Sequence, residues 1–196
     1  EVADLEQARR LCDETGSWIQ DALTSAACSH YFQAVYQISA ALEMGERAWN
    51  LDSNSPQAAY AYHCSLLLSA DELGARDFLE MLHGRFEAHS ELEVERASRA
   101  EYSLTEQYEN ITKVVARFPH CRTARFASVT ILHGLHDESA TDTALLALMD
   151  HSPMSGDVHA LGALIALQRD QLALAVERSH RAVDLNSFSA LGHFVQ

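Results

Sequence analysis

A spacing of about 34 residues recurs along the chain and restricts the available folds more than any other feature. Residues 47–55 (RAWNLDSNS) resemble residues 181–189 (RAVDLNSFS). Ala116 lies nearly midway between Ala48 and Ala182, and each of the two intervals is close to twice that spacing. A fixed period of this length indicates a repeat array in which each unit buries its apolar face against its neighbours. We therefore expect about five copies of one unit.

Each unit is predicted to be a pair of helices, because apolar residues recur at helical spacing. Steps of four and three residues place one such stripe on a single helix face, comprising Leu104, Tyr108, Ile111, Val115 and Phe118. The chain has three prolines, Pro56, Pro119 and Pro153, and each follows an apolar stripe by a few residues. The fixed φ and missing N–H of proline suit a helix boundary. No run shows the two-residue alternation of a half-buried strand, so the sequence predicts an all-α fold.

This pattern of helix pairs resembles the tetratricopeptide repeat (TPR) family. The copy that matches best has Ala160, Leu161 and Gly162 in its first helix, followed by Ala175 and Ala182 in its second. The resemblance implies a TPR-like α-solenoid, a right-handed superhelix of about five helix-turn-helix repeats. We expect one domain over residues 1–196, with divergent N-terminal helices in 1–34 (near 3–14 and 18–29) and repeats in 35–196. Because the chain begins without methionine, we also expect it to be a segment of a longer protein.

The charge of the chain excludes some partners. It has 28 acidic and 14 basic residues, for a formal net charge of −14. Such a surface repels phosphate backbones, so we expect no direct nucleic-acid binding by this segment. We also expect no membrane insertion by this segment, because no stretch approaches the ~20 apolar residues of a membrane helix.

The four cysteines are widely scattered, at Cys12, Cys28, Cys64 and Cys121. None forms the close pairs that zinc ribbons and redox motifs require. We interpret them as reduced and mostly buried, which favours a cytoplasmic location. Two disulfides in a secreted protein are the alternative.

Groups with catalytic or metal-binding chemistry are sparse. His133 and His136 share a helix face next to Asp137, which permits metal binding, but no further ligands cluster nearby. A position in the last turn of a helix, where histidine complements the dipole, explains them equally. His63 precedes Cys64, yet adjacency does not provide the oriented base that a nucleophile needs. We therefore expect no enzymatic site, no cofactor and no metal.

The resemblance implies a binding role instead. In TPR arrays the first helices of successive hairpins line a concave groove, which would place the following residues on or near it: Tyr60, His63, Ser128, Ile131 and His159. We expect a non-catalytic protein or peptide interaction module. Its partner is expected to be basic or apolar, given the acidic excess. The alternative for Tyr60 and His63 is simple packing between helices.

A second functional hypothesis remains open. Residues 181–186 (RAVDLN) and 190–193 (ALGH) also resemble helical-repeat portions of bacterial transcriptional regulators. That resemblance implies an effector-sensing regulatory domain. Separately, the apolar residues at the C-terminus, Ala190, Leu191, Phe194 and Val195, would expose a stacking face that favours a homodimer.

Overall fold

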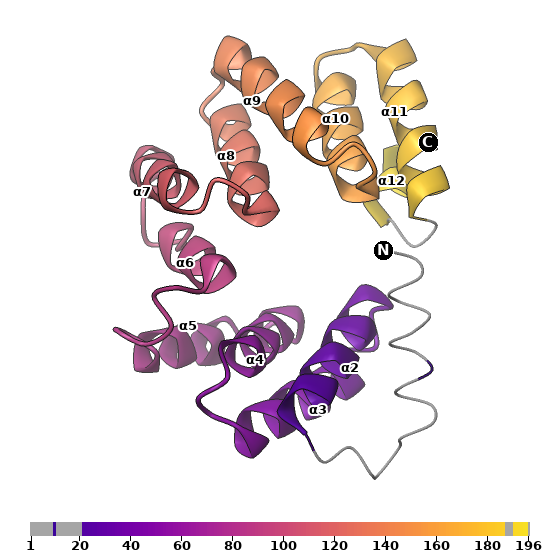
Figure 1. The fold of residues 1–196 in the computed structure, drawn as a ribbon. Helices are drawn as coiled ribbons and strands as arrows, with labels where there is room; N and C mark the ends of the chain where they lie inside the picture. Colours follow the sequence, from indigo (N-terminus) through magenta and orange to yellow (C-terminus); the bar gives the residue numbers. More distant parts are fainter. Residues whose placement is uncertain (1–9, 11–20, 187–189, 196) are drawn as a thin grey trace. The chain divides into compact units, whose positions relative to one another are not determined.

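The chain is all-α in the part described by a computed structural model, which covers Arg10 and residues 21–186 and 190–195. Eleven helices and no strands occur among these residues, which confirms the predicted fold class (Figure 1). The first helices of successive pairs are α2 (Ala22–Ala34), α4 (Pro56–Leu68), α6 (Ser90–Ala97), α8 (Arg122–Gly134), α10 (Gly156–Gln168) and α12 (Ala190–Val195). The second helices are α3 (Ile38–Leu51), α5 (Glu72–Met81), α7 (Leu104–Arg117), α9 (Glu138–His151) and α11 (Leu172–Leu185).

The helix positions reproduce the period found in the sequence. The first helices begin at positions 22, 56, 90, 122, 156 and 190. The intervals between successive starts are equal, except that the interval from α6 to α8 is shorter by two. The helix α2 is in register with the later ones, whereas the sequence placed a helix near 18–29. The helix expected near 3–14 lies outside the described residues, apart from Arg10.

Because one interval is short, the middle repeat aligns with the others differently from the prediction made from the sequence. Ala48 and Ala182 are both fully buried at the eleventh position of their helices. Val114 occupies this position in α7 and is buried, whereas Ala116 is exposed. The sequence comparison paired Ala116 with Ala48 because a uniform period hides a deletion of two residues. The deletion falls where α6 ends after eight residues instead of thirteen.

The turns inside four of the hairpins share one geometry. Two positions after the last residue of each first helix lies a residue at positive φ, namely Tyr36 (φ 57°), Ala70 (φ 60°), His136 (φ 59°) and Asp170 (φ 58°). The next N–H then donates back into the helix, as Asp71 does to the Leu66 carbonyl at 3.1 Å. This is the Schellman arrangement, for which glycine is the usual residue. None of the four positions is glycine, so each turn carries the steric cost of a side chain in the left-handed region.

The described helices divide into two compact units, residues 1–92 and 93–196. In the first unit α2 packs on α3 and α4, and α4 packs on α5. Gly45 in α3 permits the close approach of α4, because a Cβ there would lie 3.0 Å from the Cα of Tyr62. The ring of Phe78 meets the rings of Trp49 and Tyr62 edge-on, at centroid distances of 5.0 and 4.9 Å.

The second unit has the same internal plan. The helix α8 packs between α7 and α9, and α10 packs on α9, α11 and α12. One core cluster centres on Ile111 and Ile131, and another on Leu148, Val158 and Ile165. The helix α6 spans the boundary, since Leu92 belongs to the core of the first unit and Val94 to a core of the second.

The cysteines differ from the expectation at one position. Cys28 is buried and disulfide-bonded, whereas Cys64 and Cys121 are free. The prediction that all four cysteines are reduced is therefore wrong for Cys28. The other half of its disulfide lies outside the described residues. None of the described helices is long and apolar enough to cross a bilayer.

The strained turns predict a stabilising substitution. Replacing Ala70 with glycine should raise the free energy of unfolding by about 1 kcal/mol, because glycine adopts positive φ without a steric cost. Ala27, an exposed residue inside α2, supplies the matched control. Ala27→Gly should lower the same free energy by about 1 kcal/mol, because glycine weakens a helix interior. Urea unfolding of both variants checks the pair, and destabilisation by Ala70→Gly would contradict the strained geometry.

Candidate functional site

A groove in the first unit is lined by the first helices of successive hairpins. Its cavity volume is about 570 Å³, within the usual range of ligand sites. Four lining residues come from α2, two from α4 and four from the segment that begins α6. They are Leu23, Ala26, Ala27, His30, Gln57, Tyr60, Ala88, His89, Ser90 and Glu91.

Three rings form a row along this groove. The Tyr60 ring lies between two imidazoles, with centroid distances of 5.6 Å to His30 and 5.8 Å to His89. The interplanar angles are 44° and 45°, so the rings are tilted rather than stacked. All three residues are half-buried, which leaves part of each accessible from the groove. We call His30, Tyr60 and His89 the aromatic row.

The orientation of His30 is fixed by a network behind it. The amide nitrogen of Gln33 donates to the Ser29 hydroxyl at 3.1 Å and to the Ala61 carbonyl at 3.0 Å. The Gln33 amide oxygen is therefore left to accept from His30 Nδ1, at 3.2 Å. These contacts assign the proton of a neutral His30 to Nδ1. They also tie α2 to α4, which holds the first two rings of the row on one scaffold.

His89 is held by the helix that follows it. Its Nδ1 lies 3.4 Å from the backbone nitrogen of Leu92, where a side chain that caps the helix start accepts a hydrogen bond. The same nitrogen is 3.6 Å from a carboxylate oxygen of Glu91, which also accepts from the Ser90 hydroxyl at 2.7 Å. The His89 side chain is 15% exposed and that of Glu91 is 35% exposed. Glu91 is the one acidic residue among the described residues of the lining.

The charge of the groove follows from this burial. Removal of water lowers the pKa of His30, although its bond to Gln33 opposes the shift. Burial likewise lowers the pKa of His89 against the opposing effect of Glu91. Both imidazoles are therefore uncharged at neutral pH. Among its described residues, the groove then carries one negative charge, on Glu91, and otherwise neutral groups.

Of the residues that the sequence singled out, one lines this groove. Tyr60 stands at its centre, whereas His63 is only 3% exposed and is not part of the lining. In the second unit Ser128 lines a separate hollow of about 450 Å³, and Ile131 is buried in the core. His159 is half-buried, with Nε2 3.0 Å from the Pro153 carbonyl oxygen.

Sequence reasoning missed His30, His89 and the role of Glu91. A signal was nevertheless present in the repeat register. His30 is eight residues after the start of α2, Tyr60 is four after the start of α4, and His89 is one before the start of α6. Each ring is thus about one helical turn nearer the start of its helix than the ring before it. A row of rings that crosses successive helices obliquely can be predicted only from accurate helix boundaries. The sequence placed these boundaries only approximately.

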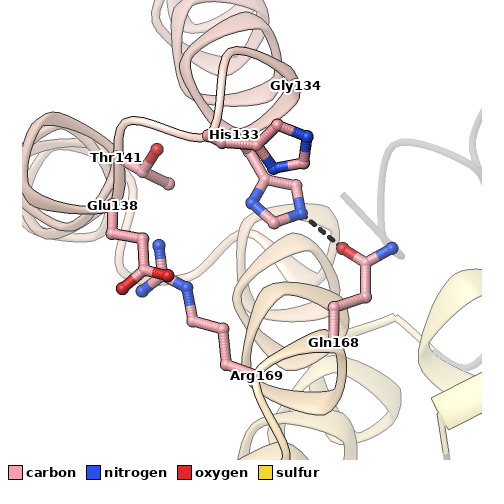
Figure 2. A pocket seen from close by; sticks show the side chains of 7 residues that line it. His133, Gly134, Glu138, Thr141, Gln168 and Arg169 are labelled. Atoms are coloured by element: carbon pink, nitrogen blue, oxygen red, sulfur yellow. Dashed lines mark hydrogen bonds between the residues drawn. The ribbon is translucent and has the colours of Figure 1, made fainter.

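A second pocket, of about 480 Å³, lies at the turn ends of two hairpins in the second unit. Figure 2 shows the side chains of His133, Glu138, Gln168 and Arg169 around it. The Nε2 atom of His133 bonds to the Gln168 amide oxygen, which links α8 to α10. Arg169 pairs with Asp142 of α9 at 2.6 Å. Within the lining, His133 and Gln168 therefore bind each other, whereas Arg169 pairs with a residue outside the lining.

The histidines considered as metal ligands are in this second pocket. His133 and His136 both line it. No group of three or more potential metal ligands occurs among the described residues. Asp137, the third residue considered, has another task, because its carboxylate caps α9 by accepting from the Ala140 N–H at 3.0 Å.

Comparisons with solved structures establish the fold. A thermophilic TPR protein from Thermus thermophilus superposes with a TM-score of 0.70 at 15% identity, over 88% of this chain and 95% of that chain. A tetratricopeptide repeat protein from Parabacteroides merdae gives 0.68 at 10% identity, over 99% and 78%. YrrB, a TPR protein with an unusual peptide-binding site, gives 0.50 at 15% identity, over 95% and 97%. The fold is TPR-like, as the repeat spacing predicted. No protein-family model matches the sequence, and a search of curated proteins finds no match.

Burial of the two imidazoles predicts how stability depends on pH. A histidine whose pKa is lower in the folded state than in the unfolded state binds more protons when unfolded. The free energy of unfolding should therefore fall as the pH drops from about 7 through the unfolded value near 6.5. Urea unfolding across this range checks the sign. The slope should be smaller in a His30→Gln, His89→Gln double variant, and ring signals in NMR spectra that titrate above 6.5 would contradict the burial argument.

Proposed function

We propose that this segment is a non-catalytic protein interaction module that binds a peptide segment of its partner in the groove around Tyr60. The observation that carries the proposal is the row of rings presented by the first helices of successive hairpins. Aromatic side chains in such a position supply large contact area at low cost in conformational entropy. Apolar residues flank the row, and few polar groups accompany it, as in most ligand sites.

The similarity in fold supports a peptide ligand in general terms. YrrB, one of the similar structures, is described as a TPR protein with a peptide-binding site. The charge of the present chain adds the expectation of a basic or apolar partner. The acidic surface also favours a partner other than nucleic acid. The disulfide at Cys28 is typical of proteins in oxidising compartments rather than in the cytoplasm.

The proposal predicts that Tyr60→Ala abolishes capture of the partner. The immobilised segment is incubated with an extract of the source organism, and bound proteins are identified by mass spectrometry. The loss is expected because a central aromatic residue in a binding site contributes about 2 kcal/mol or more, a thirtyfold loss of affinity.

Tyr36→Ala is the matched control. Tyr36 belongs to the same unit, is 62% exposed and does not line the groove. A protein that binds the wild type and Tyr36→Ala but not Tyr60→Ala identifies the groove as the binding site. Equal capture by all three proteins, confirmed as folded by circular dichroism, would contradict the proposal.

One observation favours a second function, the sensing of a small effector. The pocket in Figure 2 has a volume suited to a small molecule and combines histidine, arginine and glutamate side chains. An effector there would contact the ends of α8 and α10 together. It would thereby stabilise the second unit for a fused output domain to detect, as in a regulator of transcription.

This second function predicts a co-purifying ligand. Native mass spectrometry of the protein isolated from its source should detect a bound small molecule, and Arg169→Gln should release it. The reason is that Arg169 supplies the guanidinium of the pocket. Arg125→Gln is the control, because Arg125 lies on α8 outside the lining. Protein that carries no added mass under native conditions would count against an effector.

A further inference from the structure

We infer that the groove of the first unit selects a lysine or arginine side chain of the bound peptide, seated on the aromatic row with Glu91 as its counter-ion. The inference rests on the proposed function and specifies its ligand. The charge, the rings and the apolar surface of the groove each favour such a side chain.

The charge of the lining excludes an anionic ligand. Among the residues that the structure describes, the lining includes one carboxylate, that of Glu91, and no lysine or arginine. The two imidazoles add no positive charge at neutral pH, because burial disfavours their protonated forms. A carboxylate or phosphate group entering the groove would lose water and gain no opposite charge. A cation would gain the attraction of Glu91, which is strengthened by partial removal of water.

The aromatic row supplies a second attraction for a cation. The face of an aromatic ring attracts a positive charge within about 6 Å of its centroid, by about 0.5–2 kcal/mol. Tyr60 is the strongest of the three rings for this contact, because neutral imidazole has a weaker π-face. Its neighbours in the row are rings on both sides.

The apolar part of the lining matches the stem of a long basic side chain. Leu23, Ala26, Ala27 and Ala88 provide aliphatic surface, and Leu23 is 61% exposed. Lysine and arginine lay their methylene groups on such surface while the charged end remains at a polar group. A short cation would leave this surface uncovered, and a purely aliphatic side chain would leave Glu91 without a counter-ion. The groove therefore fits a long side chain that ends in a positive charge.

The test uses single-residue probes, so that it does not depend on knowing the partner. Four blocked amino acids, the Nα-acetyl methylamides of lysine, arginine, norleucine and glutamate, are titrated into the segment at pH 7.5. The ring signals of His30, Tyr60 and His89 in NMR spectra report occupancy. The lysine and arginine probes should bind about three- to tenfold more tightly than norleucine, and the glutamate probe should not bind.

Glu91→Gln should remove the preference for lysine over norleucine while the norleucine affinity changes less than about twofold. Glu43→Gln is the matched control, since Glu43 is exposed on α3 of the same unit and does not line the groove. It should keep the wild-type preference. Unchanged ring signals in the free variants show that the aromatic row is intact.

Two results overturn the inference, namely equal binding of lysine and norleucine to the wild type and an unchanged lysine preference in Glu91→Gln. These outcomes differ from failure of the proposed function. If a partner is captured through Tyr60 but lysine and norleucine bind equally, the interaction module is supported and the cation site is not. A lysine preference without any partner lost from Tyr60→Ala would keep the cation site and remove the peptide-binding role.

Discussion

The fold depends on one constraint, that a single amphipathic hairpin cannot bury its apolar surface alone. The second helices bury a single stripe, such as Thr141, Leu145 and Leu148 in α9. The first helices are enclosed on more sides, and α10 buries eight of its thirteen residues. Stacking of neighbouring hairpins supplies this enclosure, and it fixes the distance between one first helix and the next. The position of any site that several first helices build together follows from that distance.

The groove is a product of this stacking rather than of any one helix. Its rings come from three separate hairpins, and each is positioned by a local contact of its own. Gln33 orients His30 by bonding across to the Ala61 carbonyl, while the start of α6 orients His89. Tyr60 is thereby placed between two rings that are buried enough to stay uncharged. The burial that brings the rings together also keeps both imidazoles uncharged. The charge of the described groove residues is therefore that of Glu91.

The third hairpin departs from the repeat period. The short α6 and the one shortened interval occur where the two compact units divide. Val114 takes the buried place that Ala48 and Ala182 hold in their own hairpins. His89 lies one residue before α6 and Glu91 lies in its first turn, so both line the groove ahead of the shortened interval.

The sequence by itself determined the helices, their pairing and the TPR-like fold, because apolar spacing and a fixed repeat period are properties of the chain itself. It also placed Tyr60 in a first helix, since that place follows from the period. The tertiary structure decided which side chains meet Tyr60. His63 is a neighbour in sequence but is buried, whereas His30 and His89 are far from it along the chain and lie beside the ring. It also decided that Cys28 is disulfide-bonded and that both imidazoles are neutral. Burial and inter-helix contact set these properties, and both depend on the separation of helices in space rather than along the chain.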